Sequence, residues 1–290
     1  MYYSALHKDF PRKHCVGVAT ATTVLGPYDP GNSTEPLVCH LDLGGIIDPA
    51  FLNDPIANQS YLIYKNDGNS MGTGGACGNS NWPNTPTTFQ YDAMIPNTYT
   101  SFADTGLTTT FTSITTESPT NTKSIFLTNA KSDGPNIESP QTWYQEYSST
   151  GNSTKRAYHL LYDSGCFADQ SYRIQHLTCW LNDTTTTFTS CPWSTLKKTS
   201  ESTLLQTGRY PQPDNNPDAL LYAPGGPGTT VDGKYMAFHA DIDPNWFNNP
   251  PAAVVSGPTY TRKRALFIAE LEIDGDSSGL RIKRLVMPSS

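Results

Sequence analysis

The feature that most constrains the fold is a short strand of aromatic and apolar residues that recurs along the chain, each time followed by a polar break. The strand occurs four times, at residues 1–5, 60–66, 157–163 and 234–240. Three copies are followed by a second strand of β-prone residues, at 15–20, 171–178 and 265–271. Three copies are preceded by a short strand with a polar or glycine-rich break, at 45–51, 136–140 and 220–227. Such a repeat is typical of sheets arranged around a common axis.

The repeated strand order favours a β-propeller over a β-sandwich, because each unit repeats the same sheet. No helical period of useful length interrupts the pattern. The repeats are long for propeller blades, and Thr- and Asn-rich insertions such as 113–122 account for the excess length. We therefore predict one all-β domain over residues 1–290, in which the innermost strand of each blade lines a central channel.

The charge balance argues against nucleic acid as a partner. The chain carries a formal net charge of −7, whereas binding to phosphates needs clustered Lys and Arg. No stretch of about 18 apolar residues is present to cross a membrane as a helix. We therefore expect neither nucleic acid nor a membrane as a partner.

The cysteines and glycosylation motifs indicate a secreted, disulfide-bonded glycoprotein. None of the six cysteines forms a C-x-x-C pair, which disfavours zinc or redox chemistry. Four N-x-S/T sequons lie in polar stretches, at Asn32, Asn58, Asn152 and Asn182. No signal peptide precedes them, and residues 1–5 read like the middle of a strand. We therefore expect the natural chain to begin upstream of Met1.

Two carboxylates stand out because each follows an isoleucine and lies close before a proline. Asp48 ends the sequence Gly-Gly-Ile-Ile-Asp, and Glu138 lies in Asn-Ile-Glu-Ser-Pro. Taken singly, Asp48 could open a turn before Pro49, and Glu138 could be a polar residue at a strand end. Both, however, open a repeat just upstream of the aromatic strand. We interpret them as a pair at one pole of the channel, the arrangement used in glycoside hydrolysis.

With these motifs the sequence resembles fungal members of glycoside hydrolase family 43. The matching stretches extend over nearly the whole chain, at 1–5, 14–20, 25–28, 44–51, 61–69, 74–77, 137–140 and 224–227. The resemblance implies an inverting, five-bladed β-propeller with three carboxylates. Glu138 would be the general acid, and Asp48 would orient it and raise its pKa, as a neighbouring negative charge does.

The third carboxylate of the family, an Asp general base, belongs to a first blade upstream of the segment that residues 1–5 match. The resemblance therefore implies that this chain holds blades two to five and lacks the base. Four other aspartates lie in loops or at strand ends, and none opens a repeat as Asp48 and Glu138 do: Asp42, Asp54, Asp67 and Asp163. We assign none of them as a substitute base.

Three further residues are candidates for contact with substrate. His239 resembles the central-channel histidine of the family, which can contact a bound calcium ion or water; the alternative is a hydrogen-bonded core histidine. Phe51 and Phe167 could stack on sugar faces or could be ordinary core residues. No cofactor is required, and a structural calcium ion in the channel is compatible with the resemblance.

The resemblance implies a secreted, monomeric enzyme that acts on plant cell-wall pentose polysaccharides of the arabinan, arabinoxylan or xylan type. Without a base, we expect this chain to hydrolyse glycosides very poorly. An incomplete ring would also leave unpaired sheet edges. Two alternatives stay open: a catalytically inactive truncated propeller or carbohydrate-binding relic, and a protein-interaction propeller that uses its loops.

Six cysteines allow fifteen disulfide pairings, and the repeat favours one of them. Cys179 and Cys191 flank a Thr-rich turn that suits a hairpin, and Cys15 and Cys39 bracket one inter-blade loop. Cys77 and Cys166 then remain, in loops after the aromatic strands of two neighbouring blades. We predict the disulfides Cys15–Cys39, Cys77–Cys166 and Cys179–Cys191.

Overall fold

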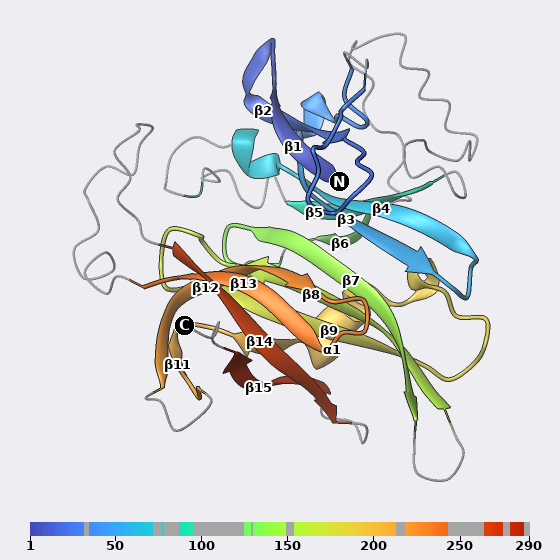
Figure 1. Ribbon diagram of the computed structural model, residues 1–290, viewed down its shortest axis with the longest axis vertical. Coiled ribbons are helices and arrows are strands. Elements are labelled where there is room, and N and C mark those ends of the chain that lie inside the picture. Colours follow the sequence, from blue (N-terminus) through green and yellow to red (C-terminus); the bar gives the residue numbers. More distant parts are fainter. Residues whose placement is uncertain are drawn as a thin grey trace.

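The computed structural model is built almost wholly from antiparallel β-sheets (Figure 1). It describes residues 1–31, 35–71, 77, 87–94, 125–128, 130–148, 154–212, 218–242, 264–274 and 279–286. The insertion at 113–122, predicted to lengthen one repeat, lies outside these ranges. Within them, no helix is long and apolar enough to cross a membrane.

The described strands form four sheets, and the strands of each follow one another in sequence. The first sheet is a hairpin of β1 (Tyr2–His7) and β2 (Phe10–Val18). The second contains β3 (Ile46–Asp54), β4 (Gln59–Asn66), β5 (Thr88–Ala93) and β6 (Ile125–Thr128). The third contains β7 (Ile137–Ser148), β8 (Thr154–Ser164), β9 (Arg173–Leu181) and β10 (Ser202–Leu205). The fourth contains β11 (Gly208–Tyr210), β12 (Ala219–Thr229), β13 (Tyr235–Asp241), β14 (Arg264–Asp274) and β15 (Gly279–Val286).

The sheets succeed one another through the molecule in chain order. In Figure 1 the β1–β2 hairpin lies at one end beside β3–β5, and β12–β15 lie at the other end, with β7–β9 between them. The aromatic segments 60–66, 157–163 and 234–240 correspond to β4, β8 and β13, each of which pairs with the strand before it and the strand after it. The repeated strand order predicted from the sequence is therefore confirmed.

Helical structure is short, and one element of it was not predicted. The α-helix α1 (Trp193–Ser200) lies between β9 and β10. Its eight residues carry only two large apolar side chains, too few for a helical period to be recognised. Trp193 is 2% exposed and its indole N–H donates to the Phe188 carbonyl at 3.0 Å. Among the described residues there are also four 3₁₀ turns, η1 (Leu41–Leu43), η2 (Gly68–Met71), η4 (Lys131–Asp133) and η5 (Phe188–Ser190).

The three disulfides pair as predicted, Cys15–Cys39, Cys77–Cys166 and Cys179–Cys191. Cys15–Cys39 joins β2 to the segment that leads into the second sheet. Cys77–Cys166 links the segments after β4 and β8, and therefore connects two neighbouring sheets. Cys179–Cys191 closes the turn that follows β9. These crosslinks restrict the unfolded chain over both short and long loops, which stabilises the fold.

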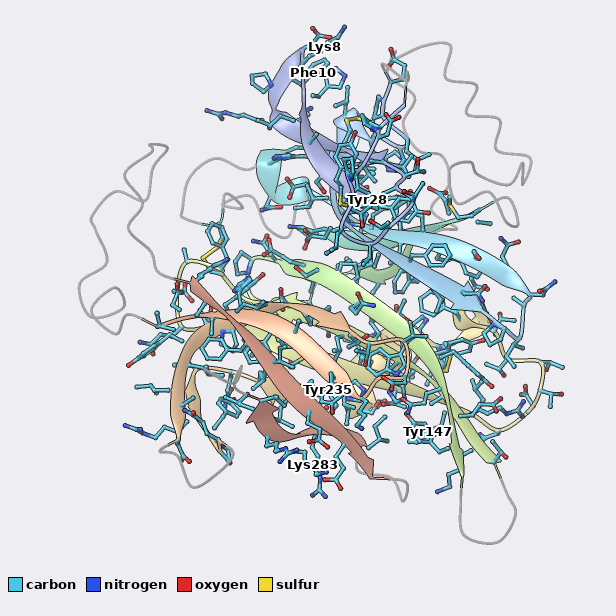
Figure 2. The ribbon with its side chains drawn as sticks, viewed as in Figure 1. Lys8, Phe10, Tyr28, Tyr147, Tyr235 and Lys283 are labelled. Atoms are coloured by element: carbon cyan, nitrogen blue, oxygen red, sulfur yellow. A yellow bond between two sulfur atoms is a disulfide. The ribbon has the colours of Figure 1, made fainter. Side chains whose placement is uncertain are left out.

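The middle of the third sheet contains a buried pair of histidines. His159 Nδ1 and His176 Nε2 lie 3.2 Å apart, and both side chains are almost fully buried. The Trp143 ring stacks on His159 at 4.7 Å, and the Tyr147 hydroxyl (labelled in Figure 2) is hydrogen-bonded to His159 Nε2 at 2.6 Å. Burial lowers the pKa of His176 to about 3 and that of His159 well below its usual value. Both rings are therefore neutral in the folded protein.

This pair predicts a loss of stability in mild acid. An unfolded histidine takes up a proton near pH 6.5, whereas folded His176 does so only near pH 3. The free energy of unfolding should therefore fall as the pH drops below about 6.5, by about 2 kcal/mol for this residue between about pH 7 and pH 5. Urea unfolding of the protein and of His176→Gln at several pH values measures the effect. The variant should lose less stability over this interval; an unchanged dependence on pH would contradict the assignment.

Candidate functional site

The same irregularity occurs in β3, β7 and β12, just before a proline in each strand. The pairing register shifts between Ile47 and Ala50, between Glu138 and Gln141, and between Tyr222 and Gly225. At each shift one non-glycine residue has a left-handed backbone, with φ of 56° at Asp48, 52° at Ser139 and 45° at Ala223. Positive φ values of this kind are uncommon outside glycine and mark turns, bulges and functional sites.

This register corrects the sequence-based alignment of the two carboxylates. Asp48 has the left-handed backbone and directly precedes Pro49. In the next sheet the equivalent residue is Ser139, which directly precedes Pro140. Glu138 precedes that position and is therefore equivalent to Ile47. Asp48 and Glu138 lie one residue apart in the repeat and not at the same place, because the shared feature is the bulge before proline.

The two carboxylates nevertheless come together between neighbouring sheets. Asp48 Oδ2 accepts a hydrogen bond from the Ser139 backbone N–H at 2.9 Å. This contact places the Asp48 carboxyl beside the residue that follows Glu138, and the Glu138 charge contributes to the raised pKa of Asp48. The structure therefore brings β3 and β7 together at this contact, whereas the shared channel and the catalytic roles of the pair stay predictions.

Glu138 is held from two sides by buried groups. The Lys65 ammonium on β4 donates to Glu138 Oε1 at 2.8 Å, and the Tyr172 hydroxyl contacts Glu138 Oε2 at 2.9 Å. Lys65 is fully buried and also lies 3.2 Å from Asp67 Oδ1. One cation thus serves several carboxylates at the junction of the second and third sheets.

Burial and these charges shift two pKa values in the site. Burial raises the pKa of Asp48 to about 6; Lys65 opposes this shift, and the Glu138 charge adds to it. For Lys65, burial by itself would lower the pKa, but the charges of Glu138, Asp67 and Asp48 outweigh it and raise the pKa above its usual value. Lys65 therefore stays charged, and Asp48 can change its protonation state in mildly acidic solution.

Asp163 lies opposite Glu138 across the β7–β8 pair and is fully buried. Its Oδ2 atom lies 2.8 Å from the Tyr172 hydroxyl and accepts the Gly226 backbone N–H at 2.7 Å. Burial raises the pKa of Asp163 well above its usual value, although hydrogen bonds from Gly226 and Tyr172 counteract it. The sequence assigns Asp163 no role as a base, but the structure makes it part of the Glu138 environment.

The Pro-Gly-Gly-Pro sequence in β12 provides room for two rings of the site. A Cβ atom on Gly225 would overlap the ring of Tyr172, and one on Gly226 would lie 2.9 Å from His239 Cδ2. Tyr172 and His239 themselves are stacked, with ring centroids 6.4 Å apart. These glycines therefore let β12 approach the site closely enough for Gly226 to bind Asp163.

The other predicted substrate-contact residues have different neighbours. Phe51 lies three residues beyond Asp48 on β3, where its ring stacks on Tyr2 with centroids 6.3 Å apart. Phe167 packs against the Cys77–Cys166 disulfide region, and its carbonyl accepts a hydrogen bond from Arg264. No contact with a sugar follows from these positions, so both roles stay predictions.

Two of the four aspartates considered as substitute bases lie elsewhere. Asp54 accepts hydrogen bonds from the Tyr158 hydroxyl and the Phe188 N–H, which is a structural role at the end of β3. Asp42 lies in η1.

The surroundings of His239 do not fit a cation site. Its Nε2 atom lies 3.2 Å from the Arg264 guanidinium, a positively charged donor. Across the described ranges, no group of three or more His, Cys, Asp and Glu side chains could hold a metal ion. We therefore assign no calcium ligand.

Sequence reasoning did not identify Lys65, Tyr172 or Asp163 as members of the site. One signal was available: β4, β8 and β13 each carry a charged residue at the last position or the last but one, namely Lys65, Asp163 and Asp241. A charge that closes an otherwise apolar strand must find a partner or water. Tyr172 carried no comparable signal, because its partners come from four different strands.

Comparisons with known proteins show the fold. No model of a known protein family matches the sequence, and no curated protein matches it. A thermostable family-43 glycoside hydrolase superimposes with a TM-score of 0.53 over 99% of this chain and 72% of its own, at 16% identity. An endo-1,4-β-xylanase from Bacteroides thetaiotaomicron VPI-5482 does so with a TM-score of 0.50 over 99% and 72% of the two chains, at 15% identity. The chain therefore shares the propeller-like all-β fold of these glycoside hydrolases.

Removal of the Lys65 ammonium should destabilise the protein strongly. Lys65→Met leaves Glu138, Asp67 and Asp48 without their shared counter-ion, and breaking a buried ion pair in this way costs about 3–5 kcal/mol. The free energy of unfolding from denaturant titration measures the loss. Lys8→Met, at the exposed tip of the β1–β2 hairpin (Figure 2), is the matched control and should change stability by less than about 0.5 kcal/mol. Equal losses in both variants would contradict a special role for Lys65.

A second prediction separates two glycines of the same strand. Gly225→Ala should displace the Tyr172 ring and reduce the free energy of unfolding by about 1–3 kcal/mol through overpacking. Gly228→Ala, whose Cβ atom would meet no atom within 4 Å, should be tolerated. Denaturant titration of both variants tests the difference. If Gly225→Ala is as stable as Gly228→Ala, the close approach of Tyr172 to β12 is wrong.

Proposed function

We propose that the protein is a glycoside hydrolase that acts on pentose polysaccharides of the arabinan, arabinoxylan or xylan type, with Glu138 as general acid. The observation that carries the proposal is the junction of β3 and β7, where the Asp48 carboxyl binds the backbone next to Glu138. This pair lies in a fold shared with a family-43 glycoside hydrolase and with a xylanase. Both the carboxylate pair and the fold were expected for this activity.

In the proposed reaction, Glu138 donates a proton to the glycosidic oxygen as the bond to the anomeric carbon breaks. Asp48 fixes the position of the acid, because its hydrogen bond to the Ser139 N–H ties β3 to the bulge beside Glu138. Tyr172 orients the second carboxyl oxygen of Glu138.

Inversion also needs a base that activates water on the opposite face of the sugar. We assign no described residue to this role. Asp67 is paired with Lys65 at 3.2 Å, and Asp163 is fully buried behind Tyr172. An added nucleophile that needs no base therefore tests the acid role of Glu138 by itself.

Three disulfides support action in an oxidising compartment. Together with the four sequons, they favour the proposal that the protein is extracellular, where plant cell-wall polysaccharides are available. The substrate class rests on the relatives in fold and on the resemblance of the sequence motifs. Carbohydrate is the partner that this proposal requires.

The alternative is a carbohydrate-binding protein without turnover. The observation that favours it is the 2.8 Å ion pair between Lys65 and Glu138, because an ammonium at this distance competes with the proton that a general acid must carry. The two functions differ in one respect. Only the hydrolase loses its function when Glu138 becomes an amide.

The test supplies a nucleophile that needs no base. Aryl arabinofuranosides and xylosides with poor leaving groups should react very slowly with the protein in water and faster when azide is added. Azide attacks the anomeric carbon, the phenol leaves with the Glu138 proton, and a glycosyl azide of inverted configuration forms. Glu138→Gln should lower the azide-assisted rate by about 10²–10⁴-fold. Rates are followed by phenol release and products by NMR.

An activated dinitrophenyl pentoside is the control, because its leaving group needs no proton and Glu138→Gln should leave its rate nearly unchanged. Rapid hydrolysis without azide that disappears in Glu138→Gln would show that a base is present after all. Sugar binding with no turnover under any of these conditions would support the carbohydrate-binding alternative.

A further inference from the structure

The Tyr172 hydroxyl touches two carboxyl groups at once. Its oxygen lies 2.9 Å from Glu138 Oε2 and 2.8 Å from Asp163 Oδ2. A phenol has one proton and can donate it to only one of these oxygens. The second short contact between oxygens therefore requires another proton. Among Glu138, Tyr172 and Asp163, only a carboxyl group can carry it. One of the two carboxyl groups is therefore protonated.

The surroundings of the two carboxyl groups identify the protonated one. Glu138 has the Lys65 ammonium 2.8 Å away, which stabilises a negative charge on it. Asp163 is fully buried, and no cation among the described residues lies within 4 Å of it. A buried carboxylate without a counter-ion is costly, so the group takes up a proton. Burial accordingly raises the pKa of Asp163 well above its usual value.

We propose that Asp163 stores a proton and passes it through the Tyr172 hydroxyl to Glu138, so that Asp163 and Tyr172 form a relay behind the general acid. This inference rests on the proposed function for its catalytic consequence, whereas the location of the proton rests on the geometry alone. Asp163 and Tyr172 are positioning residues, because they act on the glycosidic oxygen only through Glu138.

The transfer conserves protons and bonds. The O–H bond of Asp163 breaks as a new O–H bond forms on the Tyr172 oxygen, and the original Tyr172 O–H bond breaks as one forms on Glu138 Oε2. Tyr172 is unchanged, Asp163 becomes a carboxylate, and Glu138 becomes the acid that protonates the leaving oxygen. The reverse path reloads Asp163 from solvent through Glu138, the more exposed of the two at 9% against 0%.

The groups around the relay keep the proton on this path. Tyr172 does not ionise, because burial raises its pKa well above its usual value. Its ring is held between Gly225 of β12 and His239 of β13. The charged groups facing the relay from β3 and β4 are Asp48 and Lys65, with Asp67 beyond β4. On β12 the contact is the uncharged Gly226 N–H, which donates to the same Asp163 oxygen that Tyr172 contacts.

The first experiment locates the proton without any assay of activity. Infrared spectra recorded at about pH 8, where free carboxyl groups are ionised, should contain a protonated carboxyl band that shifts in D₂O. Asp163→Asn should remove the band, and Asp232→Asn, the same change at an exposed turn residue, should not. Tyr172→Phe should keep the band but change its frequency, because one hydrogen bond is lost. Absence of the band, or its persistence in Asp163→Asn, overturns the proposal.

The second experiment tests transfer. With azide present and poor leaving groups, Asp163→Asn and Tyr172→Phe should each lower the rate by about 10-fold or more and move the alkaline limb of the pH–rate profile to lower pH. Rates on the activated dinitrophenyl pentoside should change little, which a merely structural defect would not allow. Unchanged profiles in both variants overturn the relay. If the infrared band is present but Glu138→Gln has no effect on any substrate, the proposed function fails while the proton stays assigned to Asp163.

Discussion

The site depends on one buried ammonium group. Lys65 lies at the end of an apolar strand, fully buried, 2.8 Å from Glu138 and 3.2 Å from Asp67. Burial raises the pKa of Asp48 and the Lys65 charge lowers it, so that the pKa of this carboxyl is about 6. Carboxyl groups from β3, β7 and the segment after β4 can share one junction only because a cation lies among them. The ion pair between Lys65 and Glu138 also connects the second and third sheets.

The architecture explains how such a junction arises. Each of three sheets carries a bulge before a proline. The residue just before the bulge pairs with a charged residue on the next strand. The pairs are Ile47 with Lys65, Glu138 with Asp163, and Tyr222 with Asp241. One position of the repeat thus holds a cation in one sheet and an acid in the other two. The bulge turns the strand locally and exposes a backbone N–H, which Ser139 uses to bind Asp48 and Gly226 uses to bind Asp163.

The balance of protons follows from the same arrangement. Four carboxyl groups and one ammonium meet around Tyr172 and Glu138, and full ionisation would leave a net negative charge in a largely buried space. Protons on Asp163, and on Asp48 in mild acid, reduce that charge. A general acid needs a nearby supply of protons, and a buried carboxyl linked through one phenol can provide it. His159 and His176 in the third sheet show the reverse effect. Burial lowers the pKa of a histidine, so these rings lose their protons, whereas burial raises the pKa of a carboxyl group.

The sequence by itself determined the repeated strands, the all-β class, the cysteine pairs and the two residues Asp48 and Glu138. These features depend on local patterns, namely aromatic strands, turns and residues beside proline, which a linear reading can recognise. Only the tertiary structure decided the register, which makes Asp48 equivalent to Ser139 and not to Glu138. It also decided the membership of Lys65, Tyr172 and Asp163, because their partners come from strands of different sheets. Such contacts are set by how sheets pack and where bulges fall, and no local pattern in the chain encodes those distances.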